Sequence, residues 1–366
     1  MKLTNWTSPW SAVAWHRFRK HSALLLQKRC QATALQGGVI FVILLFSSVC
    51  FAQDAAKQIS AGTVEIEKQL TTLKVSDDLK QQCTNDIADT RENLKLGYLH
   101  LSLYTIRTCK LELSSLAYAA TKTNVQSKEA YEEERRQLGM LITEKDRTLT
   151  QPTPKPLPAL VVALAQVSQV QVRHFYQSGQ PSERNNNIAE GINDLGRAAA
   201  NLDFAIFVRS LRLPAPKEPL VVRSPKPELT KLEASALRTF KSATTTQQTA
   251  FSRLKSNLEA AEELNSSSLF EGALLKYLES ELYFGLIITT AENEDVQHLQ
   301  ERAGEMGRLL TTGKTDHSIG LLFCQMAQSA LKPNSGAQPS QAEIKLAVVI
   351  LNNVLPGYFD YLKKKG

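Results

Sequence analysis

Apolar residues recur at intervals of three and four along most of the chain, which is the spacing of one face of an α-helix. This pattern predicts helices over residues 53–75, 76–94, 99–120, 127–148, 159–177, 185–211, 228–264, 269–290, 294–311, 317–331 and 341–355. Only residues 167–172 (VSQVQV) alternate with the period of two that is typical of a strand. We therefore expect an all-α fold.

The second and third of these helices are expected to form an antiparallel hairpin. Ser76, followed by two aspartates, is a favourable helix start, and Gly97 can supply the left-handed residue of a turn. Cys83 and Cys109 lie at similar distances from that turn, on the apolar stripes that face each other. The pattern predicts a disulfide between Cys83 and Cys109, which would enclose 25 residues and stabilise the fold by about 3 kcal/mol. The alternative is a pair of buried thiols in the core.

Two proline-rich stretches interrupt the helical pattern. Residues 151–158 contain four prolines, and residues 214–227 read PAPKEPLVVRSPKP. Proline lacks the backbone donor of a helix and disfavours helix in the residue before it. We therefore expect an N-terminal helical lobe at 53–213 with a break at 151–158, a linker at 214–227 and a C-terminal helical lobe at 228–366.

The positive charge of the chain is concentrated at its start. Residues 1–52 contain six Lys or Arg and no acidic residue, so they carry +6 of the formal net charge of +7. The remaining residues are therefore almost neutral overall. This distribution argues against a nucleic-acid partner, which would need a basic surface on the folded body.

Residues 39–52 (VIFVILLFSSVCFA) form an apolar run behind that cationic segment. A cationic segment followed by an apolar run that ends in small residues is typical of a secretory signal. Cleavage would fall between Ala52 and Gln53. An uncleaved membrane anchor within 32–52 is the main alternative; lipid attachment at Cys50 and an organelle transit peptide are two others. With a signal or an anchor the body is exported to the periplasm or cell envelope, and it touches the membrane only through this segment.

The body after residue 52 has three cysteines, an odd number, which in an exported protein suggests one bridge and one leftover thiol. Cys324 has apolar neighbours (GLLFCQMAQ), so we expect an inert core thiol. His100 is interpreted as a surface residue near a turn and His174 as a residue at a helix end. No glycine-rich phosphate loop is present in the sequence, and no cofactor is expected.

One helix face carries residues that could bind a metal ion. Glu294, His298, Glu301 and Glu305 follow one another at helical spacing. They would form a metal site if a facing helix supplied more carboxylates or imidazoles, as in di-iron bundles. Only one such helix is visible, so a solvated charged face is the favoured interpretation.

Two local resemblances to known families are present. Residues 93–113 (NLKLGYLHLSLYTIRTCKLEL) and 264–282 (LNSSSLFEGALLKYLESEL) can be aligned as helix, short turn and returning helix, and each resembles one unit of a tetratricopeptide-type repeat. Glu279-Ser280 and the later GLLFCQ at 320–325 resemble two motifs of helical lytic transglycosylases, which implies that Glu279 would be the general acid. The second motif is interrupted by two extra residues.

The expected function is that of an exported helical interaction or scaffold protein of the cell envelope, without catalytic activity and with a protein partner. The alternative is an envelope hydrolase or a metal-binding helical bundle. In the first case Glu279 would carry the chemistry, and in the second the Glu294/His298 face would bind the ion.

Overall fold

The computed structural model describes residues 39–151, 155–180, 187–214, 216–240, 245–290, 294–332 and 338–364. For residues 39–52, 150 and 245–249 only the backbone is described. Within these ranges every regular element is helical, so the chain is all-α, as predicted. The cationic segment before residue 39 and the prolines at 152 and 154 lie outside the described residues.

The helices in chain order are α1 (Val39–Thr72), α2 (Asp77–Lys95), α3 (Leu99–Ala120), α4 (Lys128–Thr150), α5 (Ala159–Ser178), α6 (Ile188–Ser210), α7 (Lys226–Phe240), α8 (Thr245–Ser266), α9 (Phe270–Ile288), α10 (Val296–Thr312), α11 (Ser318–Leu331), α12 (Gln341–Val349) and α13 (Leu355–Lys363), with a π-helical turn at Ile350–Val354.

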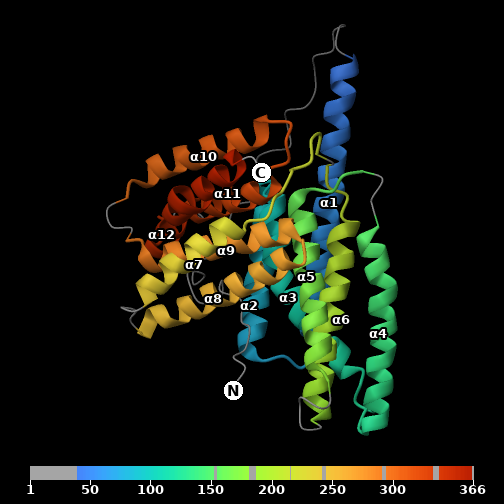
Figure 1. Cartoon of the computed structure of the whole chain (residues 1–366). Coiled ribbons are helices and arrows are strands. Elements are labelled where there is room, and N and C mark those ends of the chain that lie inside the picture. The colour runs from blue at the N-terminus through green and yellow to red at the C-terminus, as the bar shows by residue number, and fades with distance from the viewer. Residues whose placement is uncertain are drawn as a thin grey trace.

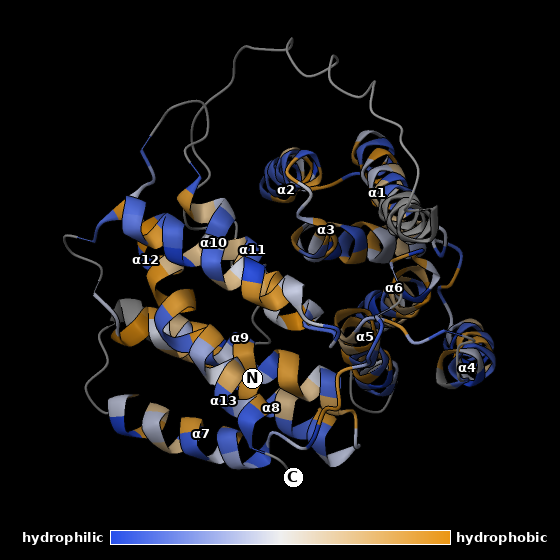
Figure 2. Cartoon of the chain, turned by 90° about the horizontal axis from the view of Figure 1, so that it is seen from above, coloured by the Kyte–Doolittle hydropathy of each residue, from blue (hydrophilic) through white to orange (hydrophobic). Residues whose placement is uncertain are grey.

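The helices fall into two groups with different directions. Helices α1, α4, α5 and α6 run along nearly one direction, and α7 to α12 lie across them (Figure 1). Seen from above, the first group is viewed almost end-on and α4 stands at its outer edge (Figure 2). Helix α5 packs on α6 and on α9, and one hydrophobic core extends from Ile59 in α1 to Tyr361 in α13. The predicted division into two lobes stays a prediction.

The hairpins α2–α3 and α8–α9 turn with the same backbone geometry. Gly97 and Ser268 occupy corresponding positions with φ values of 75° and 58°. In each turn the next residue donates its N–H to a carbonyl five positions back: Tyr98 to Asn93 at 2.8 Å and Leu269 to Leu264 at 2.9 Å. These bonds define a Schellman motif at the end of both first helices. The aligned small residues of the returning helices, Ser102 and Ala273, are both fully buried.

The segment predicted as one helix at 228–264 is two helices. Helix α7 ends at Phe240, and α8 begins at Thr245. The rings of Phe240 and Phe251 meet edge to face at 4.9 Å, which brings the end of α7 against α8.

Residues 167–172, with their strand-like alternation, are helical within α5.

The sequence predicts that the helix from residue 341 ends before Pro356. Helix α12 instead continues through a π-helical turn into α13. Leu355 donates its N–H to Ile350 O, five residues back. A proline inside a regular α-helix would clash with a carbonyl of the preceding turn. The wider turn lets the chain pass Pro356 without ending the helix. The stretch Gln341–Lys363 is long and apolar enough to cross a membrane, and half of its most apolar part is buried inside the protein.

The proline-rich segment before α7 is fixed to the body at two places. Glu218 N–H donates to Lys314 O at 3.1 Å, and Asp316 N–H donates to Glu218 O at 2.9 Å. Further on, Arg223 N–H donates to the Tyr361 hydroxyl at 2.7 Å, and that hydroxyl donates to Arg223 O at 2.6 Å. The segment is therefore attached to both the α10–α11 connection and the last helix.

The start of α5 is capped from a distant part of the chain. Asp316 accepts a hydrogen bond from Ala159 N–H, and Ser318 Oγ accepts one from Leu160 N–H at 2.9 Å. The first N–H groups of a helix have no partner inside the helix. Pro158, which precedes the helix, has no capping side chain, and the partners come instead from Asp316 in the α10–α11 connection and from Ser318, the first residue of α11.

Helix α1 runs without a break through the predicted cleavage position between Ala52 and Gln53. Cleavage there stays a prediction, and it would leave a helix that begins at Gln53. The buried residues of that remainder lie on one face and include Ile59 and Ile66. Val64 is 57% exposed, because it lies five residues from Ile59 and thus on another side of the helix.

Candidate functional site

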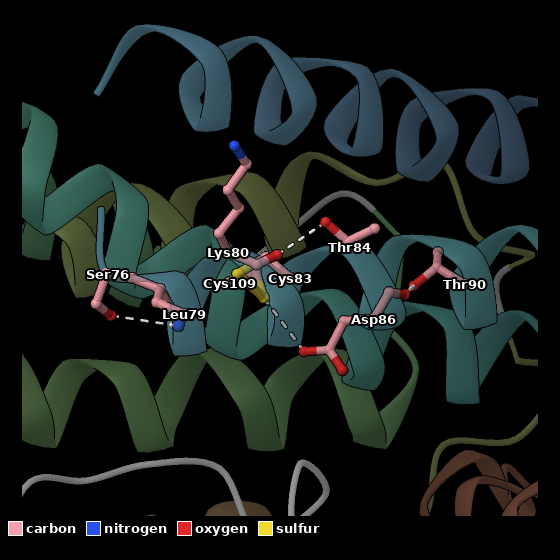
Figure 3. Close-up of a disulfide and its surroundings, with 8 residues drawn as sticks. All are labelled: Ser76, Leu79, Lys80, Cys83, Thr84, Asp86, Thr90 and Cys109. Carbon is pink, nitrogen blue, oxygen red and sulfur yellow. Dashed lines mark hydrogen bonds between the residues drawn. A yellow bond between two sulfur atoms is a disulfide. The ribbon is translucent and has the colours of Figure 1, made fainter. Parts of the chain in front are cut away.

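The predicted cysteine pair lies in the core of the α2–α3 hairpin. Cys83 and Cys109 are fully buried, their Cα atoms are 5.5 Å apart, and their sulfur atoms are joined in a disulfide (Figure 3). The hairpin brings them together because its turn is short and both residues lie on the facing stripes. Ser76 Oγ accepts a hydrogen bond from Leu79 N–H at 3.3 Å, so the expected cap of α2 is present.

The buried carboxyl group of Asp86 accompanies the disulfide, and the hydrophobic pattern does not mark it. Asp86 Oδ2 lies 3.2 Å from Cys109 Sγ (Figure 3). Burial raises the pKa of Asp86 to about 7. Burial, together with the charge of Asp86, raises the pKa of Asp89 to about 8. Near neutral pH the Asp86 carboxyl is therefore partly protonated and can donate a hydrogen bond to the sulfur.

The remaining thiol and two histidines have ordinary surroundings with one exception. Cys324 is fully buried, its thiol donates to Ala303 O at 3.4 Å, and burial raises its pKa to about 12. His174 is exposed near the end of α5. His100 was predicted to lie on the surface, but its Nδ1 is buried without a hydrogen-bond partner and burial lowers its pKa to about 4. The imidazole of His100 is therefore neutral at physiological pH.

The predicted metal-binding face is a solvated helix face. His298, Glu301 and Glu305 on α10 are exposed, and Glu294 is exposed just before the helix. Glu301 accepts a hydrogen bond from the amide of Gln297 at 3.3 Å. Across the part of the chain that the structure describes, no three His, Cys, Asp or Glu side chains lie together as a metal site would require.

Glu279 belongs to a buried polar network between α3, α8 and α9. Its carboxylate accepts a hydrogen bond from the Tyr104 hydroxyl at 2.8 Å and one from Lys276 Nζ at 2.6 Å. Lys276 Nζ also donates to Asn257 Oδ1 at 3.0 Å. The Lys276 and Glu279 side chains are 11% and 7% exposed, so this ion pair is buried.

Burial shifts the titration of the groups in this network. It lowers the pKa of Lys276, and the positive charge of Arg107 lowers it further, whereas Glu279 opposes the shift. Burial and the charge of Glu279 raise the pKa of Tyr104 well above its ordinary value. Because both oxygens of Glu279 are engaged, the structure does not present this carboxyl as an accessible acid. The sequence signal for the network is the spacing of Lys276, Glu279 and Tyr283 on one face of α9.

The second motif of the transglycosylase resemblance also has a structural explanation. Residues 320–325 lie in α11, whose Gly320 is buried beside Tyr358 and Leu310. Gln325 Oε1 accepts a hydrogen bond from Leu101 N–H at 3.1 Å. The glycine therefore allows close packing, and the glutamine joins α11 to the first turn of α3.

An open groove follows helix α4 on the side that faces α5. It has a volume of about 640 Å³ and is lined by Arg136, Gly139, Met140, Ile142, Thr143, Glu144, Arg147 and Tyr176. Met140 is 53% exposed although it is apolar. Tyr176 lies so close to Gly139 that a Cβ atom at position 139 would overlap the tyrosine hydroxyl. The hydrophobic pattern of α4 did not indicate this groove, because Tyr176, which completes its lining, belongs to α5.

Comparisons with known proteins find nothing similar to this chain: no family model, no curated protein and no solved structure matches it.

Proposed function

We propose that this chain is an exported helical scaffold protein of the cell envelope that binds an amphipathic helix of a partner protein in the α4 groove. The hairpins α2–α3 and α8–α9 serve as the tetratricopeptide-like units of its two lobes. Residues 39–52 direct export, either as a signal cleaved between Ala52 and Gln53 or as an anchor. The buried disulfide supports an oxidising location, because cytosolic thiols are kept reduced.

The observation that carries the proposal is the composition of the groove. Its lining combines the apolar or aromatic side chains of Met140, Ile142 and Tyr176 with the charged side chains of Arg136, Glu144 and Arg147. Such a mixed lining suits a helix that buries one face and keeps the other in water. The groove extends along α4 from residue 136 to residue 147, and a helix rises by about 1.5 Å per residue. About three turns of a partner helix would therefore fit.

The hydrolase alternative has less support because Glu279 is engaged by Lys276 and Tyr104. The metal-binding alternative has less support because, among the described residues, no three His, Cys, Asp or Glu side chains lie together at the Glu294/His298 face.

The test is site-specific crosslinking in the native cell. A photo-reactive amino acid replaces Met140, and in a matched variant it replaces Leu309, which is 58% exposed on α10 and outside the groove. We expect Met140 to crosslink to one envelope protein, through a peptide that lies in a helix of that protein. A purified fragment containing that helix should bind the chain, and Met140→Glu should weaken the binding at least tenfold. Equal crosslinking from both positions, or undiminished binding by Met140→Glu, would contradict the proposal.

The intact mass of protein from the envelope fraction tests the proposed export independently. We expect a chain that begins at Gln53, or an uncleaved one for an anchor. In the cleaved form, one of the three remaining cysteines should react with an alkylating reagent before reduction and all three after it. Fully reactive thiols before reduction, on protein denatured without reductant, would exclude the oxidised envelope form.

A further inference from the structure

The disulfide of the α2–α3 hairpin has an acid–base group in contact with one of its two sulfur atoms. Asp86 Oδ2 lies 3.2 Å from Cys109 Sγ (Figure 3). Cys83 and Cys109 are fully buried, and Asp86 is only 7% exposed. A carboxyl oxygen therefore lies within reach of a proton on Cys109, at a place in the core of the hairpin.

The position of Asp86 follows from the hairpin itself. Asp86 comes three residues after Cys83, so the two side chains share the face of α2 that packs on α3. The backbone carbonyl of Asp86 accepts a hydrogen bond from Thr90 Oγ1 at 2.7 Å, one turn further along the helix. Cys109 meets both residues when α3 folds back on α2. The carboxyl group is thus in place at the moment when the two cysteines meet.

The contact does little for the stability of the finished fold. Cysteine sulfur is a weak hydrogen-bond acceptor, and burying a carboxyl group costs free energy. That cost is visible in the pKa of Asp86, which burial raises to about 7. Packing therefore favours a residue without a carboxyl group at this position, whereas the chemistry of the neighbouring sulfur gives a reason for one.

A cysteine that attacks a disulfide must first lose its proton. The thiolate is the nucleophile, and burial in apolar surroundings disfavours its formation. Cys109 leaves water as the hairpin closes, so its thiol then needs a proton acceptor inside the hairpin. The pKa of Asp86, about 7, lies near the value of about 8.5 for a free thiol. Transfer of the proton from the thiol to the carboxylate is therefore nearly balanced.

We propose that Asp86 is the base that catalyses closure of the Cys83–Cys109 disulfide. The reactant is a mixed disulfide between Cys83 and the thiol of an external disulfide, which is the oxidant. The Cys109 S–H bond breaks, and its proton goes to Asp86 Oδ2. The electron pair left on Cys109 Sγ forms the bond to Cys83 Sγ. The bond from Cys83 to the external sulfur breaks, and the external thiol leaves with that electron pair and takes up a proton from water.

The two cysteines are oxidised in this sequence, and the external disulfide is reduced to two thiols. The assignment depends neither on the partner proposed for the α4 groove nor on export, because the test supplies the oxidant in solution.

The test follows closure after reduced, unfolded protein is diluted into refolding buffer with oxidised glutathione at neutral pH. All cysteines other than Cys83 and Cys109 are replaced by Ala in every variant. Samples are quenched with acid, and mass spectrometry separates the reduced, glutathione-linked and closed forms. We expect Asp86→Asn to form the mixed disulfide at the unchanged rate and to close it at least about tenfold more slowly. Asp78→Asn, an exposed position in the first turn of α2, is the matched control and should close at the unchanged rate.

Two further measurements separate this chemistry from folding. The mixed disulfide that accumulates in Asp86→Asn should carry glutathione on Cys83, because only that form needs Cys109 to lose its proton. Proteins in which Ala also replaces Cys83 and Cys109 should refold at one rate with and without Asp86→Asn, followed by circular dichroism. Equal closure rates, accumulation of the form linked through Cys109, or an equal slowing of refolding without the cysteines would overturn the proposal.

Discussion

The paired turns of the two hairpins allow a sharp test of backbone strain. Gly97 and Ser268 are both left-handed, a conformation that costs residues with a Cβ atom about 1–2 kcal/mol. A Cβ atom added at Gly97 would meet nothing within 4 Å. The change Gly97→Ala therefore introduces strain without a clash. Part of that strain is offset because alanine also restricts the unfolded chain, so we expect a net loss of about 1 kcal/mol.

The same substitution at Gly304 is the matched control. Gly304 lies inside α10, where an added Cβ atom would also meet nothing within 4 Å, and its φ is not positive. Alanine in a helix interior is more favourable than glycine by about 1 kcal/mol. Gly97→Ala and Gly304→Ala should thus shift stability in opposite directions, with a difference of about 2 kcal/mol.

The reciprocal change is made at the second turn. Ser268 is exposed, and its side chain makes no hydrogen bond within the described residues, so Ser268→Gly should relieve strain and stabilise by about 0.5 kcal/mol. Ser268→Ala keeps the strain and should be nearly neutral. All variants are compared by urea denaturation of the oxidised protein, with circular dichroism as the signal. The dependence of the unfolding free energy on urea concentration should be the same for all of them. If Gly97→Ala and Gly304→Ala shift the midpoint in the same direction, the left-handed turn is not the cause.

Three further predictions concern the disulfide and the buried charges. Replacing Cys83 and Cys109 together by Ala should lower the free energy of unfolding by about 3 kcal/mol, measured by urea denaturation, and added reductant should then have no further effect on the midpoint. Burial raises the folded-state pKa of Asp86 to about 7 from 3.8, so the stability of the fold should be greatest below pH 4 and should decline as the pH rises to 7. Asp86→Asn should remove this decline, which is on the order of 4 kcal/mol, and parallel stability profiles of the two proteins would refute this. Lys276→Met should cost about 3–5 kcal/mol because it leaves the Glu279 carboxylate buried without its cation, and adding Glu279→Gln should restore part of that loss in a double-mutant cycle.

Local patterns predicted most of the helices and the cysteine pairing. The α2–α3 hairpin is the clearest case, because its cap at Ser76, its turn at Gly97 and its two facing cysteines all lie within one short stretch of sequence. Each of these features depends on neighbours a few residues away. Helical periodicity and turn chemistry are therefore sufficient to find them.

Features that depend on distant residues were not predictable in this way. Pro356 indicates a helix end by local rules, yet the helix continues because a π-helical turn accommodates it in a core built from other helices. His100 follows a turn, but tertiary packing buries the Nδ1 atom of its ring. The hydrogen-bond network of Glu279 joins Tyr104 on α3, Lys276 on α9 and Asn257 on α8, and no local pattern records that these helices meet.

The distant cap of α5 bears on the order in which the chain can fold. The bonds from Ala159 to Asp316 and from Leu160 to Ser318 span 157 and 158 residues. A ribosome or a translocation channel delivers the chain from its N-terminus. The α2–α3 hairpin can close early, because its cysteines are only 26 positions apart, whereas α5 must wait for most of the chain before its first turn is satisfied. Until then its apolar sides, which later pack against α6 and α9, remain exposed to water. Aggregation competes most strongly with folding during this interval.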